Sequence, residues 1–196
     1  MISENLLNSA KLTNQSKSFQ KNNPIIWEIV MYGSAVEGKL TPRDIDIALI
    51  LNQKTTLNEK LEISQQFRKR LQDCWKKEFE VRAVDLLDFL DSNFLARTGI
   101  LATGFSLLQK RPLSEIFGFQ NFFIFLYELK GLNPSKKKMF YYALKGRRGS
   151  IGILQRVKGE QIGDGAIKIP QNNYYEIKEL LDGYKLKYQV KKALFY

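Results

Sequence analysis

The chain has 196 residues, of which 44% are hydrophobic and 26% are charged; this composition suits one folded domain, or one with a small appendage, and excludes a fibre or a disordered tail. The 31 Lys and Arg residues outnumber the 20 Asp and Glu residues, and the formal net charge of +11 favours an anionic partner such as nucleic acid, nucleotide phosphate or an acidic membrane surface. The chain has no histidine and one cysteine, Cys74, which excludes imidazole-based catalysis, an internal disulfide and multi-cysteine metal sites.

The first predicted elements are a short helix and two strands. The stretch up to Asn23 has a weak apolar stripe, which predicts a helix that ends before Pro24. Residues 25–32 are apolar and rich in β-branched types, which predicts a buried strand. Residues 44–51 alternate polar and apolar side chains at first and then become apolar, which predicts a second strand that enters a core.

A helix, a strand and a further helix are predicted next. The Thr56 to Glu59 segment has the spacing of a capping box, and apolar residues then recur at helical period over roughly twenty residues. Residues 81–86 predict a third strand, and residues 94–108 predict a helix with small and apolar residues interspersed.

The last third of the chain predicts helices followed by short strands. Residues 119–129 indicate a mostly apolar helix, and residues 135–145 indicate a helix capped by Ser135. Glycines between residues 146 and 165 indicate turns between short strands, because the GxxxxGK[ST] pattern of a phosphate-binding loop is missing there. The end of the chain predicts two strands, at 166–170 and 184–196, that flank a helix near 174–181.

Positive charge is concentrated in the last third of the sequence. Residues 130–196 hold 15 basic and five acidic side chains, a net charge of +10, whereas residues 1–129 hold 16 and 15. This asymmetry predicts two parts: a charge-balanced domain at 1–113 and a basic region at 114–196 that binds an acceptor or nucleic acid. No run of about eighteen apolar residues and no secretion signal occurs, so we expect a cytoplasmic protein with no membrane partner.

Polar residues around the first two strands have the pattern that phosphoryl transfer needs. Asp44 and Asp46 are two residues apart on a strand, so both carboxylates face the same way and can hold Mg²⁺. Gly33 lets the backbone approach a phosphate closely, and Ser34 can donate a hydrogen bond to phosphate oxygens. Asp85, on a later strand, is the candidate third carboxylate, which can complete a metal shell and help to draw off the hydroxyl proton.

This combination of motifs resembles the DNA polymerase β-like nucleotidyltransferase superfamily, most closely its minimal and archaeal-type members, over residues 25–108. The resemblance implies an α+β fold, with a mixed sheet flanked by helices, and we expect a basic α+β C-terminal appendage after it. It also implies paired metal ligands, a third carboxylate and a phosphate-binding turn, which correspond to Asp44 and Asp46, to Asp85, and to Gly33 and Ser34.

Two positions depart from the pattern of many minimal members, and other interpretations remain open. Glu37 and Arg43 stand where a basic residue and a serine are common, which bears on substrate choice more than on metal binding. A D-x-D pair alone is more often a pair of solvent-facing acids. Asp88 and Asp91 compete with Asp85, since all three lie in one acidic, apolar-rich segment.

A basic cluster in the C-terminal region is a candidate nucleic-acid-binding site. It consists of Lys136, Lys137, Lys138, Arg147 and Arg148, and the aromatic residues 140–142 lie among them in the sequence. This composition suits phosphate contacts combined with base stacking. The alternative is an ordinary solvated helix face whose aromatic side chains turn inward.

The function expected from these observations is transfer of a nucleoside monophosphate from an NTP, with ATP favoured, to a hydroxyl acceptor, with Mg²⁺ or Mn²⁺ as the metal. RNA, such as tRNA, is the favoured acceptor, bound by the basic region. Two alternatives stay open: modification of a protein partner, as in the toxin–antitoxin pairs of some minimal members, and a catalytically inactive module that binds nucleotide or nucleic acid.

Overall fold

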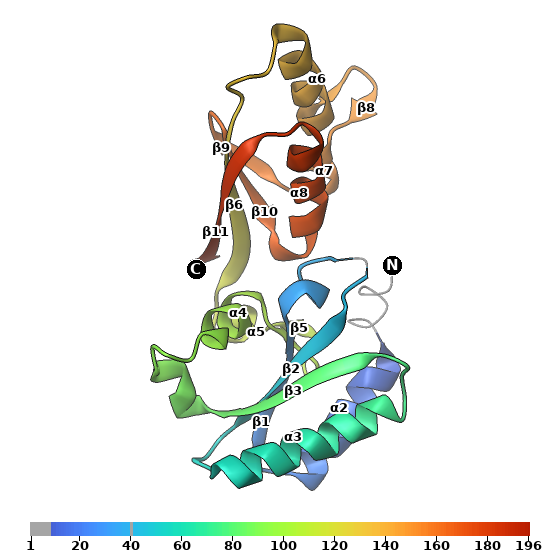
Figure 1. Ribbon diagram of the computed structural model, residues 1–196, viewed down its shortest axis with the longest axis vertical. Helices are drawn as coiled ribbons and strands as arrows, with labels where there is room; N and C mark the ends of the chain where they lie inside the picture. Colours follow the sequence, from blue (N-terminus) through green and yellow to red (C-terminus); the bar gives the residue numbers. More distant parts are fainter. Residues whose placement is uncertain (1–8, 40) are drawn as a thin grey trace. The chain divides into compact units, whose positions relative to one another are not determined.

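The computed structural model describes residues 9–39 and 41–196, and the chain separates into two compact units, Met1–Phe119 and Gln120–Tyr196 (Figure 1). The first unit carries 16 basic and 14 acidic side chains, and the second carries 15 and six. Within the described residues, no helix is both long and apolar enough to cross a membrane.

A five-stranded mixed sheet forms the centre of the first unit, in the order β3-β2-β1-β4-β5. Its strands are β1 (Ile26–Tyr32), β2 (Asp44–Leu51), β3 (Glu78–Asp85), β4 (Phe105–Ser106) and β5 (Arg111–Pro112). Strands β2 and β3 run parallel, and the other neighbours are antiparallel. The long apolar run of β2 is buried because helices cover both faces of the sheet at its far end.

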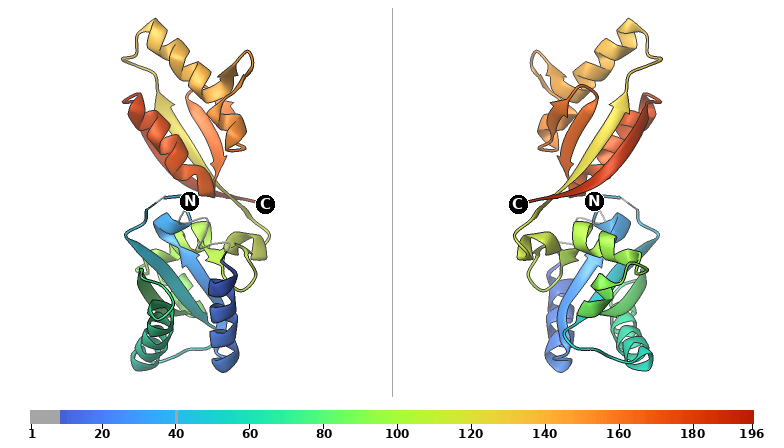
Figure 2. Two further views of the ribbon diagram at one scale, coloured as in Figure 1. Left: turned by 90° about the vertical axis from the view of Figure 1, so that its right-hand side faces the viewer. Right: turned by 90° about the vertical axis from the view of Figure 1, so that its left-hand side faces the viewer.

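Two pairs of helices cover the two faces of this sheet (Figure 2). Helices α2 (Ala10–Asn22) and α3 (Leu57–Gln72) pack on one face, where Leu12 and Phe67 are fully buried. Helices α4 (Ala96–Thr103) and α5 (Leu113–Ile116) pack on the other face, around Ile100. The predicted capping box is confirmed at the start of α3: the Thr56 side chain accepts from the Glu59 backbone, and the Glu59 carboxylate accepts from Thr56 N.

The second unit has a four-stranded antiparallel sheet with helices on one face (Figure 1). The sheet order is β11-β6-β10-β9, with β6 (Gln120–Glu128), β9 (Glu160–Gly163), β10 (Ala166–Pro170) and β11 (Lys187–Phe195). The helices are α6 (Pro134–Lys145), α7 (Ile153–Arg156) and α8 (Tyr174–Gly183), and the small hairpin is β7 (Gly146–Arg147) with β8 (Ser150–Ile151). Short 3₁₀ turns complete the chain: η1 (Gly33–Ala35), η2 (Leu86–Leu90) and η3 (Gln171–Asn173).

Three local predictions were wrong. The helix predicted at 119–129 is strand β6, in which Phe123, Phe125 and Tyr127 point into the core at period two. The cap of α6 is not Ser135 but Asn133, whose side chain accepts from Lys136 N at 2.8 Å. The helix predicted at 94–108 is shorter, because α4 ends before Gly104 and strand β4 begins directly after this glycine. Gly104 packs closely on β1: a Cβ on this residue would lie 2.6 Å from Val30 Cγ1.

Candidate active site

Asp44 and Asp46 lie on the face of β2 that α4 and α5 partly cover, at the end of the strand where this cover stops. Both side chains are half-buried, and they alternate with Ile45 and Ile47, which point into the opposite core. The neighbouring strands place Tyr32 and Glu80 directly beside Asp46. Because register partners on adjacent strands point to the same face, Asp44, Asp46 and Glu80 share one surface.

The charge of Asp46 is held in an unfavourable environment. Burial, followed by the negative charges of Asp44 and then Glu80, raises the pKa of Asp46 to about 6, and the guanidinium of Arg82 opposes this only in part. Burial and then the charge of Asp46 also raise the pKa of Tyr32 to about 12. Carboxylates crowded in this way favour a bound cation, which stabilises all of them in the charged form.

Gly33 forms a tight turn directly above this carboxylate surface. It follows β1 and has φ +73°, a left-handed conformation that glycine adopts without steric cost. A Cβ at this position would lie 2.4 Å from Asp46 Oδ2, so only glycine leaves room for the carboxylate. Half-buried Ser34 follows Gly33 within η1, so the structure brings the predicted Gly33 and Asp46 together, with Ser34 next to Gly33 in the turn.

Asp85, by contrast, is not brought to this surface. It lies five residues beyond Glu80 on β3, about 17 Å away at the usual rise per residue of a parallel strand. Since side chains alternate along a strand, Asp85 also points to the opposite face, the one that α2 and α3 cover. The prediction that Asp85 lies on a strand is confirmed, but Asp85 does not share the surface of Asp44 and Asp46.

The partners of Asp85 are structural. Its side chain is 6% exposed, accepts hydrogen bonds from Thr55 Oγ1 at 2.7 Å and Thr55 N at 3.2 Å, and lies 2.9 Å from Lys60 Nζ. Burial disfavours the charged carboxylate, but the hydrogen bonds from Lys60 and Thr55 outweigh it and lower the pKa of Asp85 below its ordinary value. Lys60 also binds Asp88 at 2.8 Å, so these residues join α3 to the end of β3.

Glu80 is the carboxylate that sequence reasoning missed. It pairs in register with Asp46, is about half exposed, and accepts a hydrogen bond from Arg82 at 3.1 Å. The signal in the sequence was alternation: Glu78, Glu80 and Arg82 are polar, whereas the residues between them are apolar. Alternation identifies the solvent face of β3, but only the register shows which of its acids lies beside Asp46.

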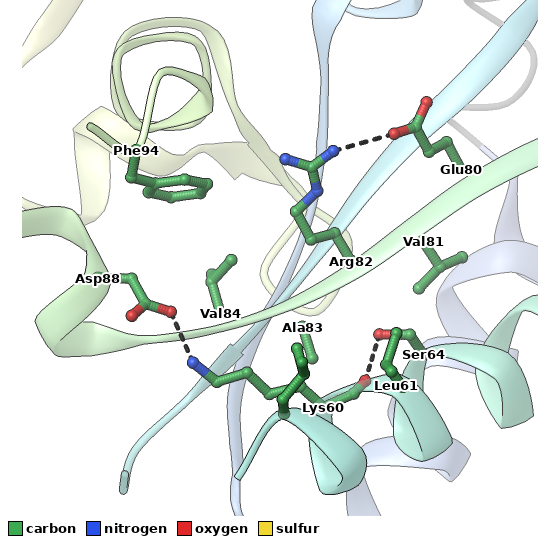
Figure 3. A pocket seen from close by; sticks show the side chains of 11 residues that line it. Lys60, Leu61, Ser64, Glu80, Val81, Arg82, Ala83, Val84, Asp88 and Phe94 are labelled. Carbon is green, nitrogen blue, oxygen red and sulfur yellow. Dashed lines mark hydrogen bonds and ion pairs between the residues drawn. The ribbon is translucent and has the colours of Figure 1, made fainter. Parts of the chain in front are cut away.

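A hollow runs along the free edge of β3 and reaches Glu80 and Arg82 (Figure 3). Lys60, Leu61 and Ser64 of α3 line one side of it, and Phe94 lines the other. Figure 3 shows the guanidinium of Arg82 directed toward Glu80 at one end, and Lys60 directed toward Asp88 at the other. Asp44 and Asp46 do not line this hollow, so it adjoins the paired carboxylates without containing them.

Asp44 and Asp46 are the two groups of this site whose chemistry suits a metal ion. Across residues 9–39 and 41–196, no group of three or more His, Cys, Asp or Glu side chains is arranged to hold a metal ion. Mg²⁺, however, is usually bound by one or two protein carboxylates together with substrate phosphates and water. The two aspartates beside the glycine turn fit that mode of binding.

The predicted basic residues are all exposed and belong to the second unit. Lys136, Lys137 and Lys138 lie in the first half of α6, and Arg147 and Arg148 lie at the β7–β8 hairpin that follows it. They therefore form a neighbouring group on one supersecondary element.

Comparison with known proteins adds one family. The family model described as Polymerase beta, Nucleotidyltransferase matches residues 14–112, which include the glycine turn, both paired aspartates, Glu80 and Asp85. No curated protein matches the chain.

Several solved structures are similar to part of the chain. One is a complex of a tri-AMPylated HEPN toxin with an MNT antitoxin from Shewanella oneidensis, at 21% identity and a TM-score of 0.35, over 50% of this chain and 69% of that chain. Another is a toxin–antitoxin structure with AMP-PNP, at 20% identity and a TM-score of 0.37, over 48% and 71% of the two chains.

Proposed function

Because this chain belongs to the polymerase β nucleotidyltransferase family, we propose that it uses Mg²⁺ or Mn²⁺ to transfer a nucleoside monophosphate from an NTP to a hydroxyl group, with release of pyrophosphate. The observation that carries this proposal is the pair Asp44 and Asp46 on one face of β2, directly beside the turn at Gly33. ATP is the favoured nucleotide.

The residues have separate roles in this reaction. Asp44 and Asp46 would hold the metal ion, which would neutralise charge on the triphosphate and lower the pKa of the acceptor hydroxyl. The backbone at Gly33 and the hydroxyl of Ser34 bind phosphate oxygens. These groups orient the α-phosphorus for in-line attack, which is where positioning contributes most to phosphoryl transfer.

The transfer also needs a group that takes the acceptor proton. The acceptor oxygen forms a bond to the α-phosphorus while the bond from that phosphorus to the pyrophosphate oxygen breaks. We assign the proton acceptor to the carboxylate of Glu80, because it lies beside Asp46 and remains partly open to solvent. Asp85, held by Thr55 and Lys60, contributes to the stability of the fold instead.

RNA is the acceptor that the charge distribution favours. The second unit carries 15 basic against six acidic side chains, whereas the first unit is close to neutral. A polyanion bound by such a surface releases counterions, so its affinity falls steeply with salt. A protein acceptor does not in general require a strongly basic binding surface.

The proposal is tested by label transfer with the full chain. Each α-³²P NTP is incubated separately with Mg²⁺ or Mn²⁺, a cellular RNA pool and cellular protein, and parallel reactions contain EDTA or the double variant Asp44→Asn, Asp46→Asn. We expect label in RNA that both EDTA and the variant abolish. Label in protein alone would overturn the RNA acceptor, and no label from any NTP would overturn the transfer reaction in favour of a binding module.

A further inference from the structure

The surface of α6 and the β7–β8 hairpin has a charge that nothing in the unit compensates. Residues 129–159 contain nine Lys and Arg and no Asp or Glu. Ion pairs in the unit form at other basic residues: Arg156 with Glu176, Lys168 with Glu160 and Lys178 with Asp182. Among the described residues, no ion pair forms at the residues that we call the α6 basic surface: Lys137, Lys138, Tyr141, Tyr142, Lys145, Arg147 and Arg148.

The tyrosines of α6 lie on this surface and not in the core. Helix α6 buries Phe140 and Leu144, which are one turn apart and 0% exposed. Tyr141 is 39% exposed, and Tyr142 is partly exposed. The inward-facing alternative considered for the aromatic residues is therefore correct for Phe140 alone, and two aromatic rings share the basic face.

Cationic groups lie over both rings. Lys138 Nζ is 5.8 Å and Arg147 Cζ is 5.2 Å from the ring centre of Tyr142, and Lys145 Nζ is 5.9 Å from that of Tyr141. Contacts of this kind hold flexible cationic side chains beside an aromatic face. Positive charge and stacking surface are thus available at the same place.

The hairpin fixes the position of Arg147 relative to the helix. Arg147 N donates to Ser150 Oγ at 3.0 Å, which closes the hairpin. Gly146, with φ +89°, joins it directly to α6, and a Cβ there would lie 2.4 Å from Ser150 O. The turn from helix to hairpin is therefore compact, and the Arg147 guanidinium lies over the Tyr142 ring.

We propose that the α6 basic surface binds single-stranded RNA, with phosphates at the Lys and Arg side chains and unpaired bases stacked at Tyr141 and Tyr142. Cations next to sequence-tolerant aromatic faces are the combination that binds single strands. A duplex offers phosphates but keeps its base faces stacked inside the helix, so it would use only the charge. This inference rests on the proposed function for its choice of RNA as the polyanion.

The charge contribution is tested by anisotropy with a labelled 12-nucleotide RNA without secondary structure, titrated with the full chain at several salt concentrations. The triple variant Lys138→Gln, Arg147→Gln, Arg148→Gln should lower the slope of log affinity against log salt by about 2, since each lost phosphate contact on a single strand counts about 0.7. The matched control Lys17→Gln, Lys54→Gln, Lys69→Gln removes the same charge from exposed positions of the first unit. Equal effects of the two variants would overturn the assignment of the surface.

The aromatic contribution needs a second variant. Replacement of both tyrosines by leucine, Tyr141→Leu with Tyr142→Leu, keeps apolar volume and should weaken single-stranded RNA binding about tenfold while duplex binding stays unchanged. The control Tyr196→Leu removes a fully exposed tyrosine and should leave affinity unchanged. Unchanged affinity of the double variant, or equal or tighter binding of duplex RNA or of single-stranded DNA, would overturn the proposal. Melting temperatures establish that each variant is folded.

Failure of this inference can be told apart from failure of the proposed function. The Asp46→Asn variant should bind the RNA as the unchanged chain does, since it removes no part of the α6 basic surface. RNA binding that follows the surface variants, without label transfer to RNA, would leave the surface standing and overturn the transfer reaction. Label transfer to RNA, together with normal RNA binding by the surface variants, would support the transfer reaction and overturn the assignment of the α6 basic surface.

Discussion

The two ends of strand β3 hold acidic residues in opposite environments. At one end, Glu80 lies beside Asp46, whose pKa is raised to about 6 by burial and by neighbouring negative charge. At the other end, Asp85 accepts two hydrogen bonds from Thr55 and forms an ion pair with Lys60, and its pKa is lowered despite burial.

This difference matches the proposal that the acids near Asp46 bind a ligand, whereas Asp85 stabilises the fold. The carboxylates near Asp46 repel one another, so the folded protein keeps them charged at a cost in stability that a bound cation can relieve. Asp85 has hydrogen-bond and ion-pair partners in the chain itself, which stabilise its charged form without a metal ion. Asp46 and Asp85 are the same residue type on adjacent strands, and their different neighbours shift their pKa values in opposite directions.

Removing the charge of Asp46 gives the largest expected effect. The Asp46→Asn substitution should lower kcat for label transfer by on the order of a hundredfold or more, because it removes a metal ligand from the reacting centre. Its free energy of unfolding at pH 7 should not fall, since a repelled charge is removed. Asp164→Asn, at an exposed position, is the control for both measurements.

A methyl group at Gly33 should disturb the position of the Asp46 carboxylate. Gly33→Ala places a Cβ where Asp46 Oδ2 lies, and displacement of a reacting group by about 1 Å can cost on the order of a hundredfold in rate. Gly118→Ala is a matched control, because Gly118 also has positive φ, at +80°, but has nothing within 4 Å of the added Cβ. Both should lose about 1–2 kcal/mol of stability, and only the first should lose activity. Similar kcat values for the two variants would contradict this role of the turn.

A substitution of Glu80 tests its assignment as the proton acceptor. Glu80→Gln should lower kcat by roughly tenfold to a hundredfold, because the acceptor proton then lacks its carboxylate. The loss should become smaller at high pH, where hydroxide competes as the base. Pre-steady-state label transfer measures the chemical step directly. If Asp85→Asn slows that step more than Glu80→Gln does, the assignment is wrong.

Asp85 should matter for stability. The Asp85→Asn substitution should lower the free energy of unfolding by about 2 kcal/mol, because hydrogen bonds to a charged group in a buried site are lost. Urea denaturation followed by circular dichroism gives the value. A double-mutant cycle with Lys60→Met should recover a coupling energy of the same sign, and the absence of coupling would show that the ion pair contributes nothing.

The smallest expected effect is on the pH dependence of the free energy of unfolding. Because the pKa of Asp85 is lower in the folded state than in the unfolded state, its contribution is fully present above pH 4 to 5 and is lost as the pH falls through the folded-state value. The stability difference between the unchanged chain and Asp85→Asn should therefore shrink as the pH falls below about 4, the ordinary pKa of an Asp side chain. A difference that stays constant over this range would contradict the lowered pKa.

Features with a local signal in the sequence could be predicted. The capping box at Thr56 and the apolar run of β2 specify a helix and a strand through neighbours within four residues. The D-x-D spacing on β2 determines that Asp44 and Asp46 share a face, whatever the rest of the fold does.

Features that depend on tertiary neighbours could not be predicted from the sequence. In β6, Phe123 and Phe125 face the core while Phe122 and Ile124 lie half-buried on the other face, so the strand is apolar on both sides and shows no alternation. The choice between Glu80 and Asp85 depends on the register of two parallel strands that are joined through a whole helix. No local pattern encodes that register.

The most direct test of this account is a crossed measurement on two variants, Asp46→Asn and Asp85→Asn, with label transfer and urea denaturation performed on the same preparations. The account predicts that Asp46→Asn loses activity and keeps its free energy of unfolding, whereas Asp85→Asn loses about 2 kcal/mol and keeps the kcat of the folded protein. Loss of kcat in Asp85→Asn at full stability would contradict it and would return the third-carboxylate role to Asp85.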